Sequence, residues 1–336
     1  MRTSVTPEIR DLRLYGSAAL RPLLEVESDL WRRRLDWEYM GSARLLLEYL
    51  DARALPGFVA VEQGEILGYV FCVYEANKAV IGNVFAAPRA TGKWTTEEMT
   101  QCEVERVLLE HAVSLLTHSP GVDRVETQLL LHPAGELAEP LETAGFRRAE
   151  RLYLERELSA GASVQAPRWT LDGGCRLRAW HDGEMTRAAQ LIVAAYSDHP
   201  DSRINDQYCS TQGAQRFLHN IVRYPGCGIF VPEASFVAVD VVSGELAGMV
   251  LSSQISAQPG AECGHITQIC VLPEYRRRGL AERLMREAAD ALAAKGLRKL
   301  TLTVTASNAG AIRLYEREGF RERHRFDAAV WVRPGA

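Results

Sequence analysis

The segment Val271-Leu-Pro-Glu-Tyr-Arg276-Arg277-Arg278-Gly279-Leu280-Ala281 decides the fold class, because it connects a predicted buried strand to a predicted amphipathic helix. The strand covers residues 265–271 and ends at Pro273. The helix runs from about 279 to 295, where Gly296 stops it. Its apolar residues recur at the spacing of one helix face: Leu280, Leu284, Ala288 and Leu292.

Further strands and helices alternate around this segment. We expect strands at 175–180, 235–241, 245–252 and 300–305, one or two strands within 320–332, and helices at 182–195, 211–222 and 309–318. Strands that alternate with helices after a hairpin indicate the α/β class. The expected form is a mixed α+β layer, in which helices flank a mixed sheet.

Two blocks of sequence occur twice, in the same order. The hairpin pattern Gly57-Phe-Val-Ala-Val with Gly64-Glu-Ile-Leu-Gly68 recurs as Ser235-Phe-Val-Ala-Val with Gly244-Glu-Leu-Ala-Gly248. Leu141-Glu-Thr-Ala-Gly145-Phe146-Arg147 recurs as Tyr315-Glu-Arg-Glu-Gly319-Phe320-Arg321. The similar offsets predict two tandem copies of one domain. We place the copies at 1–158 and 172–336, joined by a linker at 159–171 that is small, polar and Pro/Gly-containing.

Composition excludes several classes of protein. The 336 residues carry 39 Lys plus Arg against 43 Asp plus Glu, and this slight acidity disfavours a nucleic-acid binder. The first residues have no apolar core that would predict a signal peptide, and no apolar run approaches the roughly 20 residues that a membrane span needs. The 7 cysteines and 8 histidines form no CxxC, HExxH or Cys/His cluster, so we expect a cytoplasmic chain with no metal site.

The quoted segment carries the chemistry. A helix N-terminus presents unpaired backbone N–H groups and a partial positive charge. Gly279 and the small Ala281 allow an anion to approach that backbone closely, and three arginines add charge. These features predict a cradle for a pyrophosphate group.

Two motifs carry a family resemblance. Arg276-x-x-Gly279-x-Ala281 resembles the acyl-CoA-binding loop of the GCN5-related N-acetyltransferases (GNAT), whose pattern is Gln/Arg-x-x-Gly-x-Gly/Ala. Downstream, Ser307-Asn308-Ala-Gly-Ala-Ile-Arg-Leu314-Tyr315-Glu-Arg-Glu-Gly319-Phe320 resembles the second signature of that family. The resemblance covers about 172–336, and it reaches the first half only through the repeat. It implies two tandem acyl-CoA N-acyltransferase-like domains, with acetyl-CoA as the acyl donor.

The resemblance also implies roles for individual residues. Tyr315 would be the general acid for the departing thiolate, a role that suits a phenol with a pKa of about 10. The donor would be held by the strand end, the loop and the second signature. These residues are Ile269, Cys270, Val271, Arg276, Arg277, Arg278, Gly279, Leu280, Ala281 and Asn308.

A base must also remove the proton of the amine. Relatives often place a Glu or His eleven residues before the first Gln/Arg of the loop, which here is His265. An imidazole suits this task because its ordinary pKa is about 6.5. Glu262 and Thr267 are alternatives.

The first copy lacks the corresponding groups. Aligning Gly145 on Gly319 puts Leu141 at the position of Tyr315, and leucine cannot donate a proton. Ala134 or Pro133 falls at the position of Asn308. We therefore expect residues 1–158 to form a degenerate, non-catalytic copy.

These observations predict an N-acetyltransferase that acts on a primary amine, most simply a small molecule. The loop 197–208 contains Asp198, Asp201 and Asp206, which would favour a cationic acceptor, although a solvated polar loop would look the same. The alternatives are a CoA sensor, a scaffold without turnover, and an acetyltransferase of proteins or peptides. No nucleic-acid or membrane partner is expected, and the chain would be a monomer or a homodimer.

Overall fold

The computed structural model describes residues 7–88, 99–158, 174–224 and 226–335, so the predicted linker at 159–171 lies outside the described residues. The chain divides into two compact units. Unit 1 comprises the described parts of Met1–Leu35, Tyr39–Arg151 and Arg325–Ala336. Unit 2 comprises those of Asp36–Glu38 and Leu152–His324. No described helix has the length and apolar character that crossing a membrane requires.

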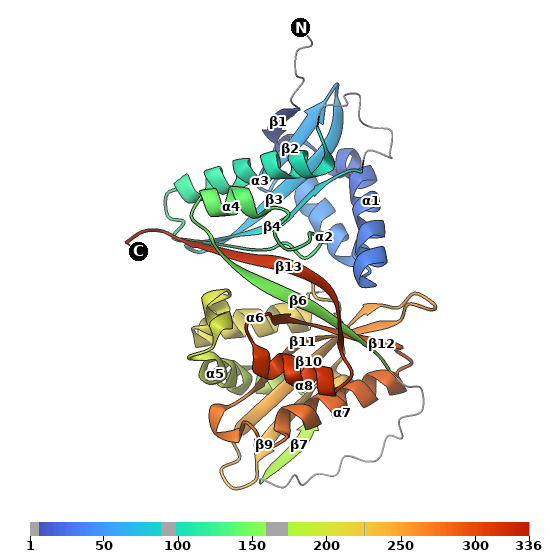
Figure 1. The fold of residues 1–336 in the computed structure, drawn as a ribbon, viewed down its shortest axis with the longest axis vertical. Coiled ribbons are helices and arrows are strands. Elements are labelled where there is room, and N and C mark those ends of the chain that lie inside the picture. Colours follow the sequence, from blue (N-terminus) through green and yellow to red (C-terminus); the bar gives the residue numbers. More distant parts are fainter. Residues whose placement is uncertain (1–6, 89–98, 159–173, 225, 336) are drawn as a thin grey trace. The chain divides into compact units, whose positions relative to one another are not determined.

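Unit 1 is a mixed sheet with helices on both faces (Figure 1). One apolar cluster joins the sheet to α1 and α2, and a second joins it to α3 and α4. The strands, in sheet order, are β1 (Glu8–Asp11), β2 (Gly57–Glu62), β3 (Glu65–Glu75), β4 (Lys78–Ala86), β5 (Arg124–Gln128) and part of β13 (Arg321–Val332). The helices are α1 (Ser17–Leu35), α2 (Met40–Asp51), α3 (Gln101–His118) and α4 (Ala138–Thr143).

Unit 2 repeats this plan. One cluster packs α5 and α6 on its sheet, and another packs α7 and α8 on the opposite face. The strand order is β6 (Arg147–Glu157), β12 (Lys299–Thr305), β11 (Cys263–Val271), β10 (Leu246–Ser256), β9 (Phe236–Asp240) and β7 (Cys175–Ala179), and β8 (Ile229–Phe230) also pairs with β10. The helices are α5 (Met185–Tyr196), α6 (Thr211–Arg223), α7 (Leu280–Ala294) and α8 (Ala309–Arg317). Short 3-10 turns occupy Leu12–Leu14, Asp182–Glu184, Pro200–Arg203, Asp206–Tyr208, Pro232–Ala234 and Pro273–Tyr275.

The structure confirms the predicted class, a mixed α/β sheet flanked by helices, and nearly all of the predicted elements of the second half. The predicted strand at 265–271 is β11, and the predicted helix at 279–295 is α7. The region 320–332 forms the single strand β13.

The last strand of each half contributes to the other unit. Residues 328–332 of β13 pair antiparallel with β5 of unit 1, from Ala328 opposite Gln128 to Val332 opposite Arg124. Residues 152–157 of β6 belong to unit 2 and lie next to β12. The units therefore differ from contiguous blocks at 1–158 and 172–336. The backbone hydrogen bonds of a strand edge can be made by a strand from a distant part of the sequence, and local sequence patterns do not specify which segment that is.

Both sheets contain the same fork. Parallel pairing of β4 with β5 runs only from Lys78↔Arg124 to Ile81↔Thr127, and that of β11 with β12 runs only from Cys263↔Lys299 to Ile266↔Leu302. Beyond these pairs the two strands diverge, and we call this divergence the fork.

A bulge lies at the start of each fork. The register of the antiparallel neighbour shifts so that Gly82 in β4 and Thr267 in β11 have no opposite residue. Matching the two ladders makes Val80 equivalent to His265, Val84 to Ile269 and Ala86 to Val271. The repeat is thus visible in backbone pairing as well as in sequence.

A buried carboxyl group lies between α1 and the sheet of unit 1. Glu27 is fully buried and accepts hydrogen bonds from Tyr69 Oη (2.6 Å), from Trp31 Nε1 (3.0 Å) and from the amide of Asn83. Burial raises the pKa of Glu27 to about 7, because desolvation disfavours the carboxylate more than these donors favour it.

Glu27→Gln tests this group. Because folding raises the pKa of Glu27 above 4.5, its contribution to stability is complete below pH 4.5 and is lost as the pH rises through about 7. Between about pH 5 and about pH 8, we expect the thermal midpoint of the wild type to fall by several degrees relative to that of the variant. This fall corresponds to a loss of about 1–3 kcal/mol in the free energy of unfolding. Glu25→Gln, an exposed site on the same helix, is the control. Parallel midpoint curves for wild type and Glu27→Gln would contradict the assignment.

Candidate active site

The N-terminus of α7 has the form of an anion cradle. Gly279 caps the helix with a φ of 77°, and no side chain caps the N–H groups of the first turn. Arg277, two residues earlier, also has a positive φ, of 60°. Glycine adopts this conformation without strain, whereas a β-carbon makes it costly. The uncapped first turn therefore presents N–H groups that can donate hydrogen bonds to an anion.

The three predicted arginines have different positions. Arg276 is turned toward the backbone, where Nε donates to Val271 O (3.2 Å) and Nη2 donates to Ala195 O (2.7 Å). The guanidinium of Arg278 lies 5.4 Å from the ring centre of Tyr275. Arg277 is exposed. Arg276 therefore ties the end of β11 to the end of α5.

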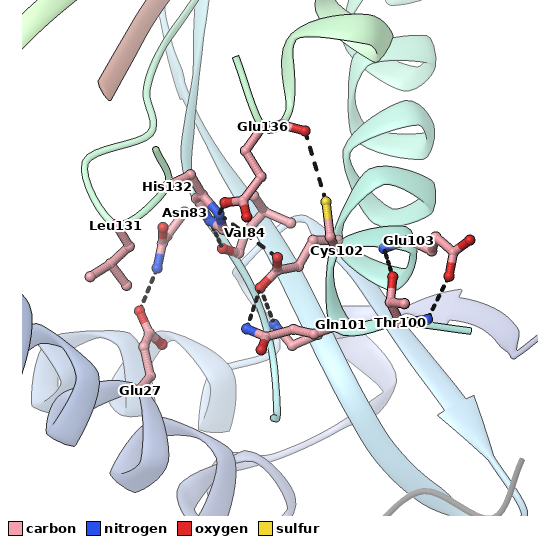
Figure 2. Close-up of polar contacts among 12 residues, drawn as sticks. Glu27, Asn83, Val84, Thr100, Gln101, Cys102, Glu103, Leu131, His132 and Glu136 are labelled. Atoms are coloured by element: carbon pink, nitrogen blue, oxygen red, sulfur yellow. Dashed lines mark hydrogen bonds and ion pairs between the residues drawn. The ribbon is translucent and has the colours of Figure 1, made fainter. Parts of the chain in front are cut away.

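The fork of unit 1 is occupied by its own side chains. Ala86 N–H donates to the Glu105 carboxylate (2.9 Å), and His132 Nε2 lies 3.0 Å from Val84 O (Figure 2). Both backbone groups therefore face away from β3, into the fork. Burial raises the pKa of Glu105. For His132, burial alone would lower the pKa, but the hydrogen bond to Glu136 and the charge of Glu105 outweigh burial, so the pKa of His132 is raised.

The helix N-terminus of unit 1 is capped by side chains. Thr100 and Glu103 form a reciprocal capping box at the start of α3 (Figure 2). Glu105 lies five residues after this cap, and Leu284 lies five residues after Gly279 in α7. Leucine cannot accept a hydrogen bond, so the equivalent N–H of Val271 receives no such partner from α7. A cavity of about 270 Å³ lies beside Glu105 and His132 in unit 1.

Tyr315 is the buried residue of α8, and its side chain packs in the core. It is 6% exposed, and its ring meets that of Phe320 edge-on at 5.9 Å. Burial raises the pKa of Tyr196 well above its ordinary value, and the neighbouring Tyr208, Cys270 and Tyr315 raise it further. The predicted general acid is therefore a neighbour of Tyr196 at the end of α5.

Asn308 joins α8 to the loop after α5. Its Oδ1 caps α8 by accepting from Ala311 N–H (3.1 Å), and its Nδ2 donates to His199 Nε2 (3.1 Å). In the same loop Asp201 is buried and accepts from Thr305 Oγ1 (2.5 Å). Of the three acidic residues noted in this loop, Asp201 is thus buried and hydrogen-bonded, and it lies where the two strands of the fork diverge.

His265 lies on the face of β11 that packs toward α5 and α6. Its Nδ1 is 2.8 Å from Thr301 Oγ1, and the Thr301 hydroxyl is 3.1 Å from Gly264 O. A hydroxyl that donates to this carbonyl can accept from the imidazole, so the arrangement favours a proton on Nδ1. The equivalent residue in unit 1 is Val80, which cannot take up a proton.

Aromatic rings enclose His265. Tyr153 of β6 stacks on the imidazole at 6.1 Å, and Trp37 of the segment Asp36–Glu38 lies 5.2 Å from it. Asp36 anchors this segment by ion pairs with Lys299 (2.9 Å) and Arg323 (2.5 Å). Sequence reasoning missed Trp37, because nothing local marks a residue so far along the chain as part of this site.

Two further residues complete this face. The predicted contact residue Cys270 is buried, and burial raises the pKa of its thiol to about 12, so it packs as a neutral thiol. Gln268 lies between Cys270 and His265 and was also missed. Strict alternation places Gln268 opposite to His265, but the bulge at Thr267 returns both to one face.

Comparison with known proteins agrees with this geometry. The sequence model of the Acetyltransferase (GNAT) family matches residues 194–320. A mycothiol acetyltransferase of Beutenbergia cavernae is 33% identical over 287 residues, which cover 82% of this chain and 84% of that protein. A [ribosomal protein bS18]-alanine N-acetyltransferase of Escherichia coli is 48% identical over 54 residues, which cover 16% of this chain and 36% of the enzyme.

Solved structures share the fold along the whole chain. A GCN5-related N-acetyltransferase from Sphaerobacter thermophilus has a TM-score of 0.59 at 19% identity, covering 98% of this chain and 96% of that one. A tandem GNAT protein from the clavulanic acid biosynthesis pathway has a TM-score of 0.58 at 14% identity, covering 98% and 99%. At these identities the similarity concerns the fold alone.

Arg276→Ala tests the role of the backbone tie. We expect a lower thermal midpoint, by several degrees, because two carbonyls lose a charged donor at about 1–3 kcal/mol. Differential scanning calorimetry measures the change, and Arg277→Gln at the exposed neighbour is the control. An unchanged midpoint for Arg276→Ala would leave the arginine without this structural role.

Proposed function

We propose, from the premise that this chain belongs to the GNAT family of acetyltransferases, that unit 2 transfers the acetyl group of acetyl-CoA to the amine of a small molecule. The contrast between the two forks carries the proposal. Unit 1 satisfies its diverging strand with Glu105 and His132, and it caps its helix with Thr100. Unit 2 has Leu284 and Gly279 at the positions of Glu105 and Thr100.

The residues present fit the donor substrate. The pantetheine arm of acetyl-CoA carries amides, which can pair with Ile269 C=O and Val271 N–H as an added strand would. The first-turn N–H groups of α7 suit its pyrophosphate, and Arg277 and Arg278 add positive charge beside them. Asn308 contributes at the other side of the fork, where Nδ2 is also hydrogen-bonded to His199.

The reaction is a direct acyl transfer. The amine nitrogen attacks the thioester carbonyl carbon, the new C–N bond forms, and the C–S bond breaks. His265 Nε2 takes the proton from the amine, with the imidazole held in this tautomer by Thr301. Tyr315 protonates the departing sulfur of CoA. The side chain of Tyr315 is buried, and its phenol hydroxyl is a hydrogen-bond donor.

A small-molecule acceptor agrees with the comparisons. The relative that matches along 82% of this chain is named for mycothiol, whereas the ribosomal-protein enzyme matches only 54 residues. His265 is buried between the rings of Trp37 and Tyr153, surroundings that suit a compact acceptor. We therefore favour a compact amine over a protein N-terminus.

Tyr315→Phe tests the general acid. With saturating acetyl-CoA and a panel of primary amines, we expect thiol release to fall about 10²-fold or more, and the limb of the pH–rate profile due to the phenol to disappear. Tyr224→Phe, at an exposed tyrosine after α6, should keep the wild-type rate. An unchanged rate across pH would remove Tyr315 from this role. Absence of thiol release by the wild type with every amine would contradict the proposed function.

Titration calorimetry with coenzyme A tests the contrast between the forks. We expect one molecule bound per chain, because the fork of unit 1 is filled by Glu105 and His132. Gly279→Val should weaken binding at least about tenfold, since a β-branched residue resists a φ of 77°. Gly121→Val is a matched control, because Gly121 has the same φ and equally open surroundings in unit 1. A stoichiometry of two would contradict the closed fork.

A further inference from the structure

The side-chain amide of Gln268 is buried, and its nitrogen has no hydrogen-bond partner among the described residues. The residue is 5% exposed. Ser253 Oγ is in the same situation in the described part of the chain, in a residue that is fully buried. A buried donor without a partner costs about 1–3 kcal/mol, so each such group calls for a physical explanation.

Both groups lie on the face of the sheet that carries His265. Ser253 is directly opposite His265 in the β10–β11 ladder, and Gln268 is directly opposite Leu251. Leu251 packs in the cluster of α5 and α6. Because opposite residues in an antiparallel pair project to the same face, Gln268 and Ser253 flank the imidazole at the start of the fork.

The duplicated unit shows how such an amide is satisfied. Asn83 occupies the position of Gln268, directly after the bulge in β4. Its Nδ2 donates to the carboxyl group of Glu27, which is buried on α1. Unit 1 therefore supplies an oxygen to this amide from its own helix. In the described part of unit 2, no helix supplies one to Gln268.

We propose that Gln268 determines specificity by donating a hydrogen bond from Nε2 to an oxygen atom of the acceptor. Ser253 Oγ provides a second polar contact beside it. The acceptor class is a primary amine with a carbonyl or hydroxyl oxygen close to the amine nitrogen, as in amino-acid amides and amino alcohols. Since His265 and Gln268 are neighbours on one face, the first takes the amine proton while the second binds the oxygen. This inference rests on the proposed function.

Matched amine pairs test the assignment. Each pair combines an oxygen-bearing amine with an analogue that lacks the oxygen, for example glycinamide with propylamine. We expect the wild type to favour the oxygen-bearing member in kcat/KM. Gln268→Met, similar in shape but without a donor, should raise KM for that member about 10- to 100-fold, with little change in kcat or in the KM of propylamine. Its thermal midpoint should stay at or above that of the wild type.

The controls separate this inference from the proposed function. Gln212→Met, at an exposed position of α6, should leave both amines unchanged. Equal KM changes for the two members of a pair, or no preference by the wild type, would overturn the role of Gln268 while acetyl transfer itself remains. No thiol release with any amine would instead defeat the proposed function, and the inference with it.

Discussion

Two parallel strands that diverge leave backbone groups facing a gap, and a buried N–H or C=O must be hydrogen-bonded to something. This constraint governs both halves of the protein. In unit 1 the diverging strand is satisfied by Glu105 and His132. In unit 2 Leu284 occupies the position of Glu105 and cannot accept a hydrogen bond, and we propose that a ligand supplies the partner there. One backbone geometry thus carries different hydrogen-bonding side chains in the two units.

The chemistry proposed for unit 2 follows from what surrounds its fork. His265 is hydrogen-bonded to Thr301, Tyr315 is buried in the core, and Arg276 holds the strand end against α5. None of these side chains acts alone, because each is placed by an element that also builds the core. The loss of function proposed for unit 1 therefore needs few changes: Val80 in place of His265, Leu141 in place of Tyr315, and a capped α3.

Sequence patterns predicted the elements and the loop before α7 well, since helix periodicity and the stop at Gly296 are local signals. The family resemblance singled out His265, which the structure places one residue before the end of the paired ladder; its role as a base stays a prediction. Gln268 escaped notice because a bulge at Thr267 reverses the alternation of faces. The sequence did not predict the position of Trp37 or the exchange of β6 and β13, because pairing between distant segments leaves no local pattern. The domain boundaries suggested by the repeat are for the same reason not the boundaries of the compact units.

The exchange of strands has a consequence for how the gene can be divided. A fragment encoding 172–336 alone would lack Tyr153 and Trp37, which enclose the imidazole of His265. It would also expose the edge of β12, and bare edges invite aggregation. The two halves repeat one plan, yet each compact unit includes a strand segment from the other half of the sequence. Truncation or separate expression would thus remove strands and side chains from a half that looks self-sufficient in sequence.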